Sequence, residues 1–420
     1  MSDKREFENP FPQHKDEYLT DPKGQLKSEQ KEHVQRAINK LLEKLYKGLE
    51  SEDGSNYTVY TGTAGIALLY IHLHRRLESG TQQYLKTGLE YIKKPLCHLK
   101  GRKYSFLCGD AGPLAIGAVI NHLLKHEDDR KSCLDRLAGL HDTVCTDRAL
   151  PDEALYGRVG YLYSLLYVQH HIGEEVVDNA LISKVASSII DSGRRLSQQE
   201  QCHCPLMYEW HEKKYLGAAH GIAGILFLLM QVKDPSFNDS LHTLVRPTVD
   251  WMLSLQFPSG NCPSSIGSSS GDKLIHWCHG APGWIYMFIK AYQLFSDEKY
   301  LEAAKRCSAV IWERGILKKG YGICHGTAGN GYAFLALYRL TNDQKYLYQA
   351  YKFGEWCINY GKHGCRSADT PYSLFEGMAG TIYFRINVIF VSGMTGTIYF
   401  LINVNFFLQI WQVQYIFLSM

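Results

Sequence analysis

Residues 278–283 read CHGAPG, and residues 324–329 repeat this pattern as CHGTAG. Each stretch places a thiol and an imidazole directly before a G-x-x-G element, which we interpret as the start of a helix. A pattern that returns after 46 residues indicates a fold built from repeated units. Because equivalent positions of such units lie close together, soft ligands from separate repeats can converge on one metal ion.

The G-x-x-G element occurs seven times, and its first glycines are Gly62, Gly109, Gly157, Gly221, Gly280, Gly326 and Gly377. The spacings between successive first glycines are 47, 48, 64, 59, 46 and 51 residues. Each spacing is long enough for two helices with their connections. A single G-x-x-G is more often an ordinary turn, but seven copies predict seven helix starts. Glycine there allows close backbone approach and the φ values of a tight turn.

Two kinds of segment alternate along the chain. The residues that follow a G-x-x-G are nearly uncharged, as in residues 66–70, 161–166 and 225–230, which predicts helices that are buried on all sides. Residues 31–50 instead place apolar residues at helical spacing among Glu and Lys, which predicts a half-exposed helix. Seven buried and seven half-exposed helices predict an all-α fold, the α/α toroid. This is a seven-fold double-helix barrel whose inner helices start at the G-x-x-G motifs.

We expect three regions: a polar N-terminal extension (1–30), the toroid (31–385) and an atypical uncharged C-terminal tail (386–420). The chain is 45% hydrophobic and has a formal net charge of +3, as expected for one large globular domain. Basic residues occur as scattered pairs rather than as clusters among aromatic residues. No nucleic-acid partner is therefore expected.

The expected location is the cytoplasm. The first thirty residues lack the apolar core of a secretory signal peptide, and residue 2 is Ser rather than the Gly needed for N-myristoylation. Twelve cysteines in such a chain are expected to be unpaired thiols in a reducing compartment. For most of them the expected role is a small buried side chain.

The candidate metal ligands are Cys278, Cys324 and His325. Each cysteine stands two residues before its glycine element, so in a ring the two thiols would face each other. His325 supplies an imidazole at the same level. Three protein ligands leave a fourth position open, which is typical of a catalytic Zn²⁺ site. The alternative is a pair of buried core cysteines, and His279 is expected to be a packed or supporting residue.

Two further segments contain histidine. His220 precedes the fourth glycine element as His325 precedes its own, so it is expected at the same mouth of the ring, where it could act as a general acid/base. The alternative is a hydrogen-bonded histidine at a helix start. The segment Cys202-His203-Cys204 follows a polar stretch and has no nearby partner, so we predict a loop there.

Over residues from about 30 to 384 the chain resembles the lanthionine synthetase C-like (LanC-like) family. The stretches that carry the resemblance are residues 106–115, 205–210, 217–224, 276–283, 317–326 and 372–384. The resemblance implies a seven-fold double-helix toroid that binds zinc through Cys278, Cys324 and His325, the same ligand set that the spacing suggests. It also implies glutathione as a bound thiol.

The family's glutathione contacts fall on Lys319 and on the segment Arg366-Ser367-Ala368-Asp369. A cationic Lys and Arg suit the two carboxylates of glutathione, and Asp369 suits its amino group. For each of these residues taken alone, solvated surface charge is the alternative interpretation.

The activity implied by the resemblance is zinc-dependent glutathione transfer. A thiol at the open zinc position loses its proton, and the thiolate can add to an activated alkene to form a thioether. The expected acceptors are dehydroalanine or dehydrobutyrine residues in peptides or proteins, or small electrophiles. By the same resemblance, His220 transfers a proton to the enolate. Glu153 lies where bacterial relatives carry an acidic residue, but we assign it no role, since such residues near helix starts also favour the helix dipole.

Two other interpretations compete with the enzyme. In the first, the protein is a glutathione- and zinc-binding redox or signalling adaptor without turnover. In the second, it associates with membranes, because residues 386–420 contain no charge and are long enough to span a bilayer. Asn and Gln interrupt that tail, and its residues 393–400 nearly copy residues 377–384, so we interpret it as an atypical carboxyl end. If it cannot complete the last helix pair, the ring is expected to gape.

Overall fold

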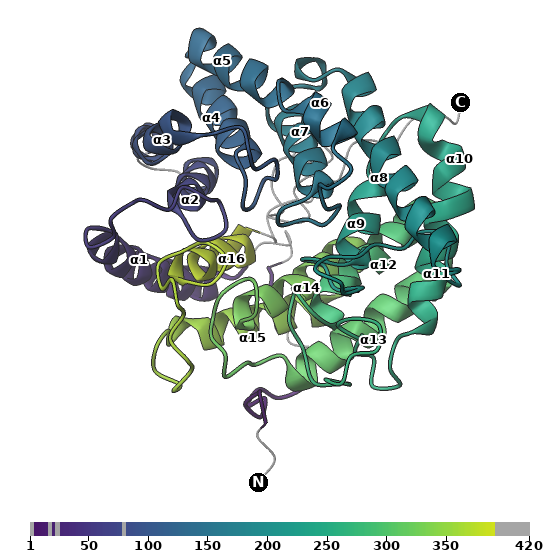
Figure 1. Ribbon diagram of the computed structural model, residues 1–420. Coiled ribbons are helices and arrows are strands. Elements are labelled where there is room, and N and C mark those ends of the chain that lie inside the picture. The colour runs from purple at the N-terminus through teal and green to yellow at the C-terminus, as the bar shows by residue number, and fades with distance from the viewer. Residues whose placement is uncertain (1–3, 16–18, 22–25, 78–80, 391–420) are drawn as a thin grey trace, which may run out of the picture.

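Helices alternate between an inner and an outer layer along the chain (Figure 1). The computed structural model describes residues 4–15, 19–21, 26–77 and 81–390. Within these ranges the chain forms helices, turns and a few isolated β-bridges, and no β-strand. The predicted all-α class is therefore confirmed.

The inner layer consists of the helices that begin at the G-x-x-G elements. These are α2 (Thr63–Arg76), α4 (Ala111–Leu124), α7 (Arg158–Ile172), α9 (Ile222–Leu229), α12 (Ala281–Phe295), α14 (Thr327–Thr341) and α16 (Met378–Phe390). Most of their residues are buried, as the uncharged sequence predicts. Each inner helix contacts the next one along the chain, and α16 contacts α2, so the inner layer closes on itself. Figure 1 looks along the axis of this ring.

The glycine elements allow each inner helix to lie against the loop that precedes it. A Cβ atom at Gly283 would overlap the carbonyl of Trp277, and one at Gly329 would overlap the carbonyl of Ile323. Among the seven first glycines, only Gly280 has a positive φ, of 113°. Close backbone approach is thus the general reason for glycine here, and the φ values of a tight turn matter at one position.

The outer layer consists of helices with one buried and one exposed face. These are α1 (Ser28–Leu49), α3 (Thr81–His98), α5 (Glu127–Ala138), α8 (Asn179–Gln199), α11 (Arg246–Ser254), α13 (Glu298–Arg314) and α15 (Gln344–Ile358). In α1 the buried side chains include Val34, Ile38, Leu41 and Leu45, which confirms the apolar face predicted over residues 31–50. The other face of α1 carries exposed Glu and Lys.

Short elements connect some of the long helices. They are α6 (His141–Thr146), α10 (Asn238–Ser240), and the turns at Glu174–Val176, Pro235–Phe237 and Leu241–Val245. The last of these is a π-helical turn directly before α11. Pro247 at the start of α11 has no N–H to donate back into that turn, which suits an irregular entrance to the helix.

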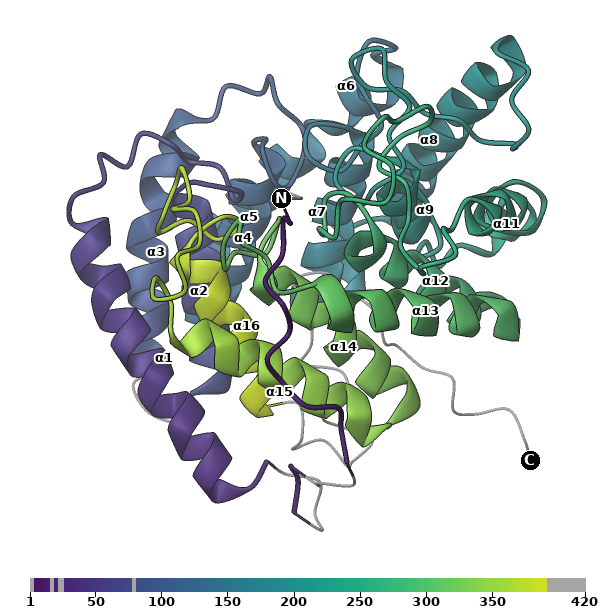
Figure 2. The same ribbon diagram turned by 90° about the horizontal axis from the view of Figure 1, so that it is seen from below.

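The N-terminal extension packs against the outer layer. The N–H of Phe7 donates to the carbonyl of Ile316 (2.8 Å), and the N–H of Lys318 donates to the carbonyl of Arg5 (3.0 Å). The same segment hydrogen-bonds to α13 and α15, across which it runs in Figure 2. Arg5 therefore lies beside the loop that carries Lys318, a contact that the polar composition of the extension does not predict.

The last inner helix continues beyond the predicted boundary at residue 385. Residues 386–390 form the end of α16, where Ile386 and Asn387 are fully buried. Because α16 contacts α1, α2, α14 and α15, the described ring closes rather than gapes. The rest of the predicted tail, 391–420, lies outside the described residues, and with it the near-copy of residues 377–384 and the predicted membrane association. Among the described helices, none has the length and apolar character that a membrane span requires.

Arg385 is a buried charge in this helix. Its side chain is fully shielded from solvent, and its Nη1 donates to the Gly354 carbonyl (2.9 Å), while Nε and Nη2 have no partner. Burial lowers the pKa of Arg385 to about 10. A buried charge without a carboxylate destabilises the folded state.

Arg385→Leu is therefore expected to raise the free energy of unfolding by about 2 kcal/mol. The measurement is chemical denaturation followed by circular dichroism. Arg36→Leu is the matched control, because the Arg36 side chain is 68% exposed on α1 and its removal should change stability little. A lower stability of Arg385→Leu than of the unmodified protein would contradict this account of α16.

Candidate metal centre and active site

Backbone hydrogen bonds join the loops that precede the inner helices. The N–H of Cys278 donates to the carbonyl of Cys324 (3.2 Å), and the N–H of Cys324 donates to that of Phe375 (2.8 Å). Phe375 in turn donates to Tyr60 (3.0 Å), and Tyr60 donates to Leu107 (3.0 Å). These bonds tie the starts of α12, α14, α16, α2 and α4 into one helix-start rim. Side chains from distant parts of the sequence are thereby held at fixed positions.

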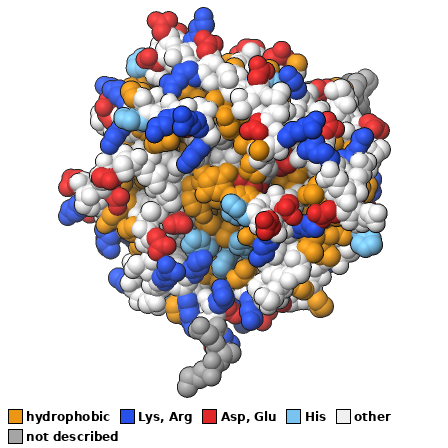
Figure 3. Space-filling view, in the orientation of Figure 1, with side chains coloured by type: hydrophobic (Ala, Val, Ile, Leu, Met, Phe, Trp, Pro, Cys, Tyr) orange, Lys and Arg blue, Asp and Glu red, His pale blue; other side chains and the backbone are white. Residues whose placement is uncertain are grey.

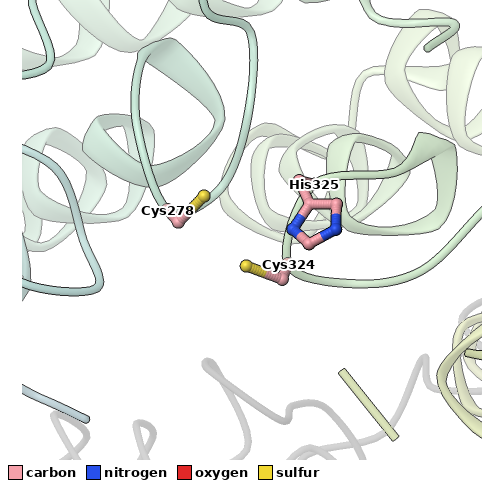
Figure 4. Close-up of side chains that lie close together, drawn as sticks. All are labelled: Cys278, Cys324 and His325. Carbon is pink, nitrogen blue, oxygen red and sulfur yellow. The ribbon is translucent and has the colours of Figure 1, made fainter. Parts of the chain in front are cut away.

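Cys278, Cys324 and His325 meet on this rim, and we call these three residues the metal group (Figure 4). Their ligand atoms, two Sγ and one ring nitrogen, all lie within 4.8 Å of one another. In Figure 4 both sulfur atoms point into the space between the two loops. Tetrahedral Zn–S bonds of about 2.3 Å require two sulfurs about 3.8 Å apart, so one ion can draw on all three donors after a small adjustment. The group is suited to a soft metal ion and leaves such an ion a fourth coordination position.

The two thiols form a coupled pair. Cys278 is 8% exposed and Cys324 is 3% exposed. A hydrogen bond with Cys324 lowers the pKa of Cys278, and the nearby Lys319 ammonium acts in the same direction. Burial raises the pKa of Cys324 well above its ordinary value. The pair is thus arranged to share one proton, which a metal ion would displace when it binds both sulfurs.

Neighbouring residues fix the loop that carries Cys278. The fully buried Asn261 accepts a hydrogen bond from the N–H of Ala281 (2.9 Å) and donates to Asp272 (2.7 Å). The loop also lies directly against Gly217, where a Cβ atom would overlap the carbonyl of Cys278. Because residue 217 belongs to the preceding repeat, this contact couples the start of α9 to the metal group.

Two histidines lie beside the metal group, of which His276 is buried and His279 is half-buried. Burial lowers the pKa of His276 to about 3 and that of His279 to about 4, so both are neutral at physiological pH. The ring of His276 lies 6.2 Å from that of His325, measured between centroids. His279 is not one of the three donors, and its Nδ1 is buried without a partner. It is thus a packed neighbour of the group.

His220 forms a hydrogen-bonded pair with Glu153 at the start of α9. The distance from His220 Nδ1 to Glu153 Oε2 is 2.7 Å. Glu153 is 2% exposed and also accepts hydrogen bonds from the N–H groups of Leu155 (2.9 Å) and Tyr156 (2.6 Å). A buried carboxylate with several donors is rigid and orients the imidazole. The sequence analysis assigned Glu153 no role, so this contact is an addition from the structure.

Three aromatic side chains surround His220. The ring centroids of Tyr156, Trp210 and Tyr215 lie 6.2, 5.0 and 5.7 Å from that of the imidazole. Tyr215 also lies 5.7 Å from His279, and so links His220 to the loop of Cys278. Sequence reasoning missed these three residues because they lie outside the glycine elements. The family resemblance of residues 205–210 was a signal for Trp210 alone.

A narrow apolar cavity of about 30 Å³ lies inside the ring next to these groups. Its walls include Phe106, Tyr163, Ala218, Phe227, Trp277 and Tyr286. Ala218 and Trp277 are close in sequence to His220 and Cys278, so the cavity adjoins both. Figure 3 shows hydrophobic side chains gathered in a hollow at the centre of this face, with histidines at its edge.

The predicted glutathione contacts lie on two adjacent loops. Lys319 is exposed, and the carbonyl of the preceding Lys318 accepts a hydrogen bond from the N–H of Arg366 (2.8 Å). Arg366 and Asp369 form an exposed ion pair (2.9 Å). Between them, Ser367 is exposed and Ala368 is half-buried. The Lys319 ammonium also lowers the pKa of Cys278, and these loops therefore lie near the metal group.

The predicted loop at residues 202–204 is observed. Cys204 is buried there, and its thiol donates to the carbonyl of Leu206 (3.3 Å). Within the described part of the chain, these residues are not grouped with other metal-ligating side chains. All twelve cysteines are free thiols.

The closed ring of inner and outer helices, with two cysteines and a histidine at one end, can be compared with known protein families. Residues 53–389 match the family described as lanthionine synthetase C-like protein. That match covers most of the chain, which therefore belongs to this family, as the sequence analysis expected.

A particular relative and a solved structure agree with this assignment. The chain is 47% identical over 396 residues to glutathione S-transferase LANCL1 of Danio rerio, which covers 93% of this chain and 97% of the relative. The structure resembles nisin cyclase with a TM-score of 0.63 and 18% sequence identity, over 87% of this chain and 95% of that one. The second comparison concerns the fold alone.

The contact between Gly217 and the Cys278 carbonyl generates a prediction. Gly217→Ala is expected to displace the Cys278 loop, and so to lower both the free energy of unfolding, by about 1–3 kcal/mol, and the affinity for a thiophilic metal ion. Titration with Co²⁺, followed by its thiolate absorption band, reports the affinity.

Gly354→Ala is the control, because a Cβ atom there would lie 3.8 Å from the nearest atom, an ordinary contact. This variant should bind Co²⁺ as the unmodified protein does. Equal Co²⁺ affinity of Gly217→Ala and Gly354→Ala would show that the contact does not position Cys278.

Proposed function

We propose that this protein is a zinc-dependent glutathione transferase. It adds the glutathione thiol to electrophilic alkenes, such as dehydroalanine and dehydrobutyrine residues in peptides or proteins, or small electrophiles, and forms thioethers. The observation that carries the proposal is the meeting of two thiols and an imidazole on the helix-start rim, in a chain 47% identical to a glutathione S-transferase. The fold behind this proposal is the seven-fold α/α toroid over residues 31–385.

The donor set supports Zn²⁺ as the metal. Two thiolates and one imidazole are typical zinc ligands, and three protein ligands are typical of catalytic rather than structural sites. Zinc bound by Cys278, Cys324 and His325 would supply a positive charge that favours the thiolate form of a neighbouring thiol.

Charged residues on the adjacent loops support binding of glutathione. Lys319 and Arg366 offer cations for its two carboxylates, and Asp369 offers a carboxylate for its amino group, with Ser367 and Ala368 between them. The ion pair between Arg366 and Asp369 holds both charges at one place on the surface, so the two groups can bind opposite charges of one ligand.

His220 is the proposed proton donor. Its Nδ1 is committed to Glu153, so Nε2 is the nitrogen that can exchange a proton with a substrate. In the reaction the sulfur bonds to the β-carbon of the alkene, and the π electrons move to the α-carbon and its carbonyl. His220 then protonates the α-carbon, and the proton released by the thiol returns to His220, so that the reaction balances. Glu153 positions the imidazole through this hydrogen bond.

Zinc content tests the metal proposal. The purified protein is expected to hold about one zinc ion per chain. Cys278→Ala and Cys324→Ala are each expected to lose most of this zinc, because the two remaining protein ligands hold the ion only weakly. Cys202→Ala is the control and should retain zinc. Elemental analysis after gel filtration gives the stoichiometry. Full zinc content in Cys324→Ala, or loss in Cys202→Ala, would contradict the assigned ligands.

Turnover separates the enzyme from the alternative of a non-catalytic adaptor. With glutathione and a dehydroalanine peptide, the protein is expected to form a thioether that mass spectrometry detects. His220→Ala should lower kcat about 10²–10⁴-fold, and Glu153→Gln by a smaller factor, because a misoriented imidazole still donates a proton. Zinc content should not change in either variant. Glutathione binding without any product in the unmodified protein would favour the adaptor.

Steady-state kinetics test the glutathione contacts. Lys319→Ala and Arg366→Ala are each expected to raise the KM for glutathione about tenfold, because each removes one charge-assisted hydrogen bond, and to leave kcat nearly unchanged. Lys93→Ala, on the exposed face of α3, is the control for general loss of positive charge. An unchanged KM in both loop variants would remove these residues from the site.

A further inference from the structure

The C-terminal ends of the inner helices bring several cations together at the end of the ring opposite the metal group. Arg75 and Arg76 end α2, His170 and His171 lie in the last turn of α7, and Arg339 lies in the last turn of α14. The three helices belong to different repeats, and all of them run away from the helix-start rim. The cluster is therefore formed by the ring, not by one local segment.

Arg76 is buried and Arg339 is half-buried, and each has guanidinium nitrogens that are shielded from solvent and lack acceptors. Arg76 is 5% exposed, and its Nε and Nη2 are buried without a hydrogen-bond partner. Nη1 and Nη2 of Arg339 are likewise buried and unpartnered. Among the described residues, no carboxylate forms an ion pair with either guanidinium. Arg75 contacts His171, and the distance from Arg75 Nη1 to His171 Nδ1 is 2.6 Å. The partner of Arg75 in this contact is an imidazole and not a carboxylate.

The immediate surroundings contain aromatic and amide groups. The Arg76 guanidinium interacts electrostatically with Tyr383, Arg75 and Tyr332, and it lies over the Phe390 ring, 5.7 Å from the centroid. The Arg339 guanidinium interacts with Arg76 and with tyrosines that include Tyr332. Asn387 of α16 donates to the Tyr332 hydroxyl (3.0 Å), and its Oδ1 is buried without a partner. The nearest supporting groups are thus neutral, and burial lowers the pKa of Arg76 to about 9.

Attraction to helix C-termini explains only part of this arrangement. The partial negative charge at the ends of α2, α7 and α14 favours cations in their last turns. It does not supply hydrogen-bond acceptors for the four orphan guanidinium nitrogens, each of which costs free energy when buried unpaired. Arg385 is a single buried guanidinium, whereas here two guanidiniums from different helices leave four nitrogens unpaired, which indicates a site for a ligand that the protein atoms do not provide.

We propose that Arg76 and Arg339, together with Arg75 and His171, bind a phosphate-class oxyanion at the end of the ring opposite the metal group. Guanidinium groups match the oxygens of phosphate through paired N–H donors. Converging guanidiniums and several orphan N–H groups fit a tetrahedral anion with a double charge better than a single carboxylate, which offers fewer acceptors and one charge. The ligand is either inorganic phosphate or the phosphate of a larger molecule.

Thermal unfolding of the full chain at constant ionic strength tests this proposal. Inorganic phosphate or adenosine triphosphate, titrated against sodium chloride, is expected to raise the unfolding midpoint by about 2 °C or more with a saturable dependence. Stabilisation by inorganic phosphate identifies the free anion, and stabilisation by the nucleotide alone identifies a phosphate ester. No saturable effect of either compound would overturn the proposal.

Variants locate the effect. Arg76→Met and Arg339→Met should each abolish the saturable rise, while Arg36→Met, an exposed cation on α1, should keep it. Asn387→Asp covers the case in which the Met variants do not fold. It places a carboxylate beside Tyr332, and so should raise the midpoint without phosphate and remove the response to it. A response that persists in all three cluster variants would show that phosphate acts elsewhere on the protein.

Discussion

The structure depends on the close approach of each inner helix to the loop before it. Where Gly283 and Gly329 stand, any larger side chain would meet the carbonyl of that loop. This approach brings neighbouring loops within hydrogen-bonding distance, so Cys278 and Cys324 are linked through their backbones (3.2 Å) before any ligand binds. The metal group is thus a consequence of how the ring packs, and its geometry is as rigid as the ring itself.

The parallel inner helices give the ring two chemically different ends. All of them begin on the side of the ring where the helix-start rim lies, and there helix dipoles favour anionic groups such as thiolates. All of them end at the other side, where the same dipoles favour cations and where Arg76 and Arg339 lie. One architectural feature therefore separates the end with the cysteine–histidine group from a cationic end. The apolar cavity next to His220 is lined by residues of α7, α9 and α12 and of the loops before the inner helices.

The repeat predicted the ring and the three donors, because both follow from spacing alone. Equivalent positions in neighbouring repeats must be close, so Cys278 and Cys324 could be paired without coordinates. The bond between His220 and Glu153 could not be predicted in this way, since it joins residues 67 positions apart that occupy different places relative to their glycine elements. The docking of Arg5 beside Lys318 was also hidden, because backbone hydrogen bonds leave no pattern in the sequence.

X-ray absorption at the zinc edge tests the central claim most directly, because it counts the sulfur atoms around the metal. For the protein loaded with one equivalent of zinc, the account predicts two sulfurs at about 2.3 Å and nitrogen at about 2.0 Å. Addition of glutathione should raise the sulfur count from two to three. A spectrum without sulfur, or one that glutathione leaves unchanged, would contradict a thiol-accepting metal centre at Cys278, Cys324 and His325.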